Sequence, residues 1–180
     1  SCEVIDPRTI SPLDLDTALR LVSQILVALG ELHAQGIVHG DIRPESIAVI
    51  GEGRAQTIKV LDLGVVLVEG ICDPAAPLAR IAPIYAPPEF RPSEPATVAS
   101  ELFAVGAMLA EMLTGKAKLP TEVEGTALPA GVLALLNRAC AAEPSERFAS
   151  SSEMLAAVDA CLTPQPAERS GRAGWFILAL

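Results

Sequence analysis

Two aspartates stand where carboxylates could do chemistry. Asp41 follows a short β-like run at 37–38, and Asp62 directly follows another at 58–61. Carboxylates at the ends of two strands in one compact β unit can converge on a single point. Phosphoryl transfer uses such a pair, because one carboxylate orients the attacking hydroxyl and the other holds Mg²⁺ against the phosphates. The spacing therefore predicts a phosphoryl-transfer site built around Asp41 and Asp62.

The elements that must position these aspartates are mainly helical. Apolar residues at three- and four-residue steps predict helices over 13–35, 96–114, 129–142 and 151–162. The second of these is apolar nearly all round, so we expect it in the centre of the domain. Short β-like runs cover 37–38, 47–50 and 58–61, with a glycine-containing turn at 51–53 between the last two. The expected fold class is mainly α with short β-hairpin strands.

Composition restricts the kind of protein further. The 180 residues are 51% hydrophobic, which excludes a disordered chain and fits one domain with a real core. With 13 Lys and Arg against 22 Asp and Glu, the formal net charge is −9, and no basic run offers a nucleic-acid surface. Aromatic residues are only 3%, too few for a base-stacking platform. The four cysteines lack zinc spacing, so we expect reduced, mostly buried thiols.

Five segments resemble, in the same order, the motifs of a protein kinase C-terminal lobe. They are His39 to Ile47, Asp62-Leu63-Gly64, Pro83 to Glu89, Ser100 to Gly115 and Glu143 to Phe148. The first resembles the catalytic loop H-R-D-L-K-x-x-N and the second resembles D-F-G. The others resemble the P-x-Y-x-A-P-E segment, the buried helix that follows it in bacterial Ser/Thr kinases, and the D-P-x-x-R signal. The chain is thus similar to the C-terminal lobe of bacterial Hanks-type Ser/Thr protein kinases over about residues 11 to 162.

The resemblance assigns roles to individual residues. By match, Asp41 takes the catalytic-base position, and Arg43 takes the position of a lysine near the transferred phosphate. Asp62 and Ser46 occupy the positions that bind ATP through Mg²⁺. The positions with a structural role are His39, Gly64, Glu89, Glu101 and Arg147.

Three of these structural positions carry specific expectations. We expect His39 to be a packed, hydrogen-bonded core residue. Glu89 and Arg147 should form a buried or half-buried ion pair between the end of the activation segment and the last two helices.

Departures from the family pattern cluster where the chemistry would occur. Five substitutions stand out: Gly40 for arginine, Arg43 for lysine, Ser46 for asparagine, Ala82 for threonine and Glu101 for the aspartate that ties the buried helix to the catalytic loop. An Arg-for-Lys exchange keeps the charge but not the compact geometry, and a serine hydroxyl is a shorter, weaker metal ligand. No glycine-rich loop or strand lysine of an N-terminal lobe is found. Residues 65–82 contain no Ser, Thr or Tyr, and the 12 residues between Gly115 and Leu128 are too few for an extra docking helix.

Two functions follow from this mixture of matches and departures. The preferred one is a pseudokinase lobe that acts in signalling as a scaffold for a protein partner and binds ATP and Mg²⁺ poorly. The alternative is the C-terminal lobe of an active ATP-dependent Ser/Thr kinase whose N-terminal lobe lies upstream. The H-G-D start also suggests a small-molecule phosphotransferase, which Pro88-Glu89 and Arg147 disfavour.

The sequence of the last residues suggests that the chain continues beyond its domain as a linker and a short apolar segment. We expect a kinase-like domain over 1–162, a linker over 163–174, and an apolar segment over 175–180 that follows Arg169 and Arg172. Six apolar residues cannot span a bilayer, which takes about 20. The segment either packs back on the domain or is the start of a membrane helix, with the basic residues at its cytoplasmic flank. The second interpretation predicts a cytoplasmic lobe tethered to the inner face of the plasma membrane.

Overall fold

Four α-helices, one β-hairpin and four short 3₁₀ helices are found in the described part of the chain. The computed structural model describes residues 12–61, 83–91, 94–116 and 128–163. The helices are α1 (Leu15–Ala34), α2 (Val98–Thr114), α3 (Ala130–Ala139) and α4 (Ser151–Leu162), and the strands are β1 (Ile47–Ile50) and β2 (Thr57–Val60). The expected mainly helical fold with a short hairpin is confirmed. In this part of the chain, no helix is both long and apolar enough to cross a membrane.

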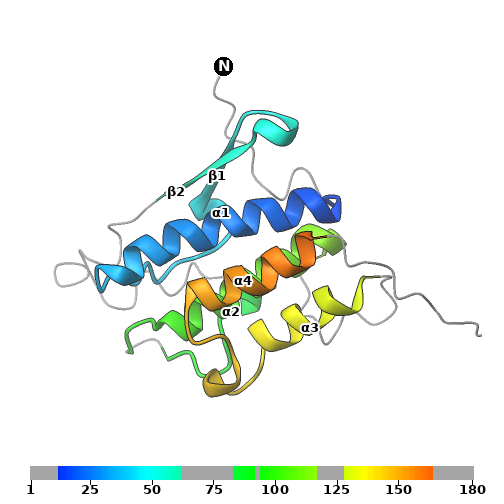
Figure 1. Cartoon of the computed structure of the whole chain (residues 1–180). Coiled ribbons are helices and arrows are strands. Elements are labelled where there is room, and N and C mark those ends of the chain that lie inside the picture. The colour runs from blue at the N-terminus through cyan, green and yellow to red at the C-terminus, as the bar shows by residue number, and fades with distance from the viewer. Residues whose placement is uncertain (1–11, 62–82, 92–93, 117–127, 164–180) are drawn as a thin grey trace, which may run out of the picture.

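Helix α1 lies between the hairpin and the other helices (Figure 1). Its first turn is capped by the Asp14 carboxylate, which accepts a hydrogen bond from the Thr17 N–H at 3.0 Å. That bond lowers the pKa of the Asp14 carboxyl below its usual value. After the helix, Gly36 adopts a left-handed φ of 72°, which glycine tolerates best. The helix therefore begins two residues later than predicted, because the cap is Asp14 rather than Ser11-Pro12.

Helix α2 is the centre of the core, as its sequence predicted. Eleven of its residues are buried, including Glu101, and its first turn is closed by a capping box between Thr97 and Ser100. Helix α3 approaches it very closely at Gly106. A Cβ at this glycine would lie 2.6 Å from the Ala139 Cβ and 2.9 Å from the Cys140 Sγ, so a side chain here would push the helices apart.

The hairpin is antiparallel, with Ile47 opposite Val60 and Ile50 opposite Thr57. Gln24 of α1 fastens it: its amide donates to the Gln56 carbonyl and accepts from the Ile58 N–H, both at 3.1 Å. Strand β1 has the predicted bounds, and β2 begins and ends one residue earlier than predicted.

The prediction of a β-like run at 37–38 was wrong. These two residues follow α1 and pair with no strand of the described residues. The Ile37 N–H donates instead to the Leu32 carbonyl at 3.0 Å, so the end of the helix uses the donor that a strand would need.

Candidate functional site

The loop that carries Asp41 is held first by the ring of His39. His39 is only 2% exposed, and its Nε2 lies 2.8 Å from the Leu61 carbonyl oxygen. Its Nδ1 accepts the Asp41 N–H at 3.3 Å. The ring therefore joins Asp41 to the residue that precedes Asp62, and it is the packed, hydrogen-bonded core residue that was expected. Asp62 and Gly64 themselves, like Ala82, lie outside the described residues.

A buried carboxylate on α2 holds the same loop from the other side. Gly40 has a left-handed φ of 80°, and its N–H donates to Glu101 Oε1 at 2.6 Å. The second oxygen, Oε2, lies 2.6 Å from His33 Nε2 in the last turn of α1. Glu101 therefore ties α2 to the loop that carries Asp41, although it stands where the family pattern has the shorter aspartate.

Asp41 and Arg43 lie side by side in this loop. Arg43 Nε is 3.1 Å from Asp41 Oδ1, and the side chains are 17% and 16% exposed. A small cavity of about 30 Å³ lies beside Asp41, between the loop and the segment 85–87. That volume admits about one water molecule or one hydroxyl group. The loop thus places an acidic and a basic group together, and the acidic one borders a small, mostly apolar cavity.

Ser46 forms hydrogen bonds to the backbone of the same loop. Its side chain donates to the Arg43 carbonyl at 2.8 Å and accepts the Arg43 N–H at 3.1 Å. The residue is 1% exposed, and its own carbonyl accepts the Leu61 N–H at 2.7 Å. Both polar functions of the hydroxyl are therefore engaged by the backbone of the loop.

This engagement bears on the predicted metal site. A magnesium ligand must turn an oxygen lone pair toward the ion. The Ser46 hydroxyl is buried, and its proton and one of its lone pairs are used in hydrogen bonds to the backbone of Arg43. In this conformation Ser46 does not fit the role of a metal ligand. Within the described ranges, no three His, Cys, Asp or Glu side chains gather as a metal site. The assignment of Asp62 to the metal stays a prediction.

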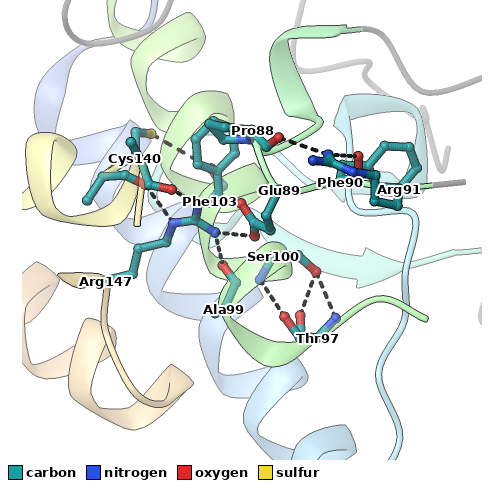
Figure 2. A network of polar contacts seen from close by, with 12 residues as sticks. Pro88, Glu89, Phe90, Arg91, Thr97, Ala99, Ser100, Phe103, Cys140 and Arg147 are labelled. Atoms are coloured by element: carbon teal, nitrogen blue, oxygen red, sulfur yellow. Dashed lines mark hydrogen bonds and ion pairs between the residues drawn. The ribbon is translucent and has the colours of Figure 1, made fainter. Parts of the chain in front are cut away.

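The predicted ion pair between Glu89 and Arg147 is present, and it is bidentate (Figure 2). Arg147 Nη1 lies 2.7 Å from Glu89 Oε1, and Nη2 lies 2.6 Å from Oε2. The Arg147 side chain is fully buried, whereas Glu89 is 33% exposed. Paired donors facing both carboxylate oxygens give the strongest geometry available to this ion pair.

Arg147 makes further contacts beyond the ion pair. Its guanidinium donates to the carbonyls of Ala141 at 2.8 Å and of Ala99 and Ala142 at 3.1 Å, and it lies 4.9 Å from the centre of the Phe103 ring (Figure 2). The buried cation is therefore saturated with acceptors. We call Glu89, Phe103 and Arg147 the anchor.

Burial and the charge of Arg147 shift the pKa values of two neighbouring groups, Glu89 and Cys140. Partial burial opposes the charge on Glu89, but the hydrogen bonds and the charge of Arg147 outweigh it and hold the pKa of that carboxyl below its usual value. Burial raises the pKa of the Cys140 thiol to about 12, despite the nearby Arg147 charge. Cys140 is thus a protonated thiol that packs against the anchor, and it is free, as is Cys161.

Three relevant contacts were not anticipated from the sequence. His33 contacts Glu101, as described above, and its other ring nitrogen contacts Ser151. The Tyr85 hydroxyl donates to Glu111 on α2. Tyr85 and Glu111 both fall in motifs that the sequence singled out, so their pairing could have been proposed. No sequence signal connects His33 with Ser151, which are 118 positions apart.

Comparisons with known proteins agree with this geometry. A sequence model described as "Protein kinase domain" matches residues 4–175. Serine/threonine-protein kinase pkn3 of Myxococcus xanthus is 34% identical over 110 residues, which are 58% of this chain and 20% of that protein. The probable serine/threonine-protein kinase PknB of Lactococcus lactis is 32% identical over 107 residues, which are 59% of this chain and 17% of that protein. The chain thus matches about a fifth of the length of these relatives.

A solved structure shows the same fold. The Mycobacterium tuberculosis PknI kinase domain superposes with a TM-score of 0.63 at 20% identity, over 89% of this chain and 63% of that one. Family match, motif order and the anchor all agree, and the chain belongs to the protein kinase domain family, with bacterial Ser/Thr kinases among its relatives.

Proposed function

We propose that this chain is a catalytically impaired protein kinase lobe that serves as a scaffold for a protein partner in signalling. The observation that carries the proposal is the state of Ser46, which is buried and hydrogen-bonded to both backbone groups of Arg43. Protein kinases generally use ATP with Mg²⁺ held by two side chains, one of them at this loop position. A lobe that has turned this group inward keeps the fold while weakening the nucleotide site.

The anchor supports the scaffold role. The segment 83–91 is fastened to the rest of the domain by the Glu89–Arg147 ion pair and by the bond from Tyr85 to Glu111. A binding surface needs a fixed backbone more than it needs a metal, because rigid elements reduce the entropy lost on association. The retained anchor and the altered loop together favour binding over phosphoryl transfer.

The alternative is that this lobe belongs to an active Ser/Thr kinase whose N-terminal lobe lies upstream. Asp41 favours it, because the carboxylate is kept beside a small cavity and next to a basic group. In such an enzyme Asp41 would orient the acceptor hydroxyl. Asp62 would hold Mg²⁺, which supplies the charge that neutralises the phosphates.

Binding of ATP with Mg²⁺ tests the proposal. We expect no thermal shift of the chain with millimolar ATP·Mg²⁺, measured against MgCl₂ alone. A ligand at 100 times its Kd would add about 2.7 kcal/mol to the free energy of unfolding, which is readily detected. A clear, saturable shift would contradict the proposal and favour the alternative.

The alternative has its own experiment. A longer protein that contains this lobe is assayed for phosphorylation of itself or of a generic protein substrate, alongside its Asp41→Asn variant. We expect no activity above that of the variant. Phosphorylation that Asp41→Asn abolishes would establish the enzyme instead.

We also propose that residues 175–180 begin a membrane helix that tethers the lobe to the inner face of the plasma membrane. The support is the sequence pattern alone: Arg169 and Arg172, then Trp175 and an apolar run. These residues lie outside the described part of the chain.

A further inference from the structure

A continuous line of hydrogen bonds joins the last helix to the catalytic loop. Ser151 Oγ, in the first turn of α4, lies 2.7 Å from His33 Nδ1. His33 Nε2 lies 2.6 Å from Glu101 Oε2, and Glu101 Oε1 accepts the Gly40 N–H at 2.6 Å. The line therefore crosses α4, α1 and α2 and ends one residue before Asp41. We call these four residues the relay.

The relay is shielded from water. Ser151 and Glu101 are each 2% exposed, and the His33 side chain is 11% exposed. A polar group that loses its partner in such a place loses the hydrogen bond without recovering one from solvent. Each hydrogen bond in the line therefore restricts the orientation of the side chain that makes the next one.

The chemistry of the groups fixes the direction of the hydrogen bonds. A Glu101 carboxylate only accepts, so His33 Nε2 must carry a proton and donate to it. In the neutral ring Nδ1 is then an acceptor, and the Ser151 hydroxyl donates to it. In the neutral ring Ser151 thus selects the tautomer of His33 that Glu101 requires. In the imidazolium Nδ1 instead donates to the Ser151 oxygen, and in both states this contact prevents the ring from rotating away.

Gly40 is the point where the relay acts on the loop. Its backbone has a left-handed φ of 80°, and its N–H points at a carboxylate on another element. Among the described residues no other acceptor of this N–H is found, so the Glu101 carboxylate holds the amide in place. The conformation of Gly40 sets the direction in which the chain continues to Asp41.

We infer that Ser151 and His33 are positioning residues of the catalytic loop: they orient the Glu101 carboxylate, which holds the Gly40 N–H and the backbone that carries Asp41. The inference rests on the proposed function only in treating this loop as the functional site. It makes the start of the last helix a part of the machinery that shapes the loop, whether the loop binds or catalyses.

The neighbouring serines provide a matched control. Ser150 caps α4 by accepting the Glu153 N–H at 3.1 Å, and Ser152 is exposed. Only Ser151 of the three contacts His33 among the hydrogen bonds described. Ser151→Ala removes the relay contact, whereas Ser152→Ala makes the same chemical change one position away.

The first measurement uses the unaltered chain. The protein contains only two histidines, so long-range ¹H–¹⁵N spectra of the ¹⁵N-labelled chain resolve each imidazole, and the His33→Gln spectrum identifies its signals. We expect His33 as the neutral tautomer protonated on Nε2 or as the imidazolium, both of which donate to Glu101. A neutral ring protonated only on Nδ1 would overturn the inference.

The second measurement is amide hydrogen exchange of Gly40, compared with that of Ile25 in the buried part of α1. We expect Ser151→Ala to accelerate exchange at Gly40 by at least about tenfold more than at Ile25, and to shift the His33 ring signals. Ser152→Ala should change neither. Equal acceleration at both amides, or none at Gly40, would reduce Ser151 to a packing residue and overturn the inference.

These readouts are independent of the proposed function. Exchange at Gly40 and the tautomer of His33 are measured without nucleotide. An ATP·Mg²⁺ shift that refutes the scaffold proposal would therefore leave the relay intact, and a failed relay would leave the scaffold proposal standing.

Discussion

The anchor and the loop that carries Asp41 lie in one domain, but they differ in how many residues of the family pattern they contain. In the anchor, the glutamate and the arginine of the family pattern are both present and meet in a bidentate, largely buried pair. In the loop, Asp41 is kept, but Arg43 and Ser46 replace a lysine and an asparagine, and Ser46 is bound to the backbone of Arg43. Relative to the family pattern, the two charged residues that hold the lobe together are thus kept, whereas two positions of the loop are changed.

Glu101 lies at the boundary between these two regions. It is part of the central helix, yet its carboxylate holds the loop at Gly40 and contacts His33. The longer side chain replaces an aspartate without losing the tie. A substitution in the family pattern is therefore not in itself the loss of a contact, and each one has to be judged by the contacts that it makes.

The largest effect is expected in the anchor. Arg147→Ala would strand the partly buried Glu89 carboxylate and leave three backbone carbonyls without this donor. Removing one partner of a buried pair costs about 3–5 kcal/mol, and we expect the lower end because Glu89 is one-third exposed and can recover some hydration. Urea denaturation measures the change.

The control for this variant is Arg20→Ala, which removes an exposed ion pair with Asp16 one helical turn away. Such surface pairs contribute about 0.3–0.5 kcal/mol. Similar urea midpoints for the two variants would show that the anchor stabilises the fold no more than an exposed ion pair does.

Acidification should weaken the same ion pair. Because the pKa of Glu89 is below its ordinary value of 4.5 in the folded state, the ionised carboxylate stabilises the fold above about that pH. The contribution is lost as the pH falls from 4.5 through the lower folded pKa. We expect the difference in the free energy of unfolding between the unaltered chain and Glu89→Gln to be full at pH 7 and to shrink in this acidic range. A difference that grows on acidification would contradict this sign.

The next effect concerns the packing of α2 on α3 beside the anchor. Gly106→Ala would place a methyl group 2.6 Å from Ala139 Cβ, so the helices must separate. Overpacking of this kind costs about 1–3 kcal/mol. Gly30→Ala in α1 is the matched control, because among the described residues its Cβ would meet only Ser151 Cβ, at an ordinary 3.8 Å. We expect that control to be neutral or to stabilise by up to about 1 kcal/mol, since alanine favours helix. Thermal unfolding of both variants decides this.

A smaller effect is expected in the loop. Ser46→Ala removes two hydrogen bonds to Arg43, at about 1 kcal/mol net for each bond, and opens the loop at a buried position. Ser152→Ala, at an exposed position, should change the stability by less than about 0.5 kcal/mol. A Ser46→Ala variant as stable as Ser152→Ala would show that the hydroxyl is free after all, and would sharpen the case for a metal ligand.

No effect on stability is expected from deleting residues 170–180. A membrane segment taken from its bilayer has no place in the fold, so the melting temperature should stay constant while solubility improves. If the segment packs back on the domain, the apolar groove of about 650 Å³ between α3 and α4 is available to it, and Thr163 lies at its edge. A drop of several degrees would therefore favour packing over the membrane.

Much of the fold could be predicted from local sequence signals. The periodicity of α1 and α4, the all-apolar face of α2 and the bounds of β1 follow from side chains that are neighbours along the chain. The run at 37–38 failed because its first donor is claimed by the end of α1, which no pattern of apolar residues reveals. The Glu89–Arg147 pair was predicted only because the resemblance linked two motifs 58 positions apart.

The sequence by itself determined the four helices, the hairpin, the family and the residues that could do chemistry, because these depend on residue type and on short spacings. Only the tertiary structure decided what those residues do to one another. Ser46 turns toward Arg43, Glu101 reaches Gly40, and Ser151 meets His33 across 118 positions. Hydrogen bonds act over about 3 Å and require alignment. The partner of a buried polar group is therefore set by how the helices pack, and it cannot be predicted from the order of residues along the chain.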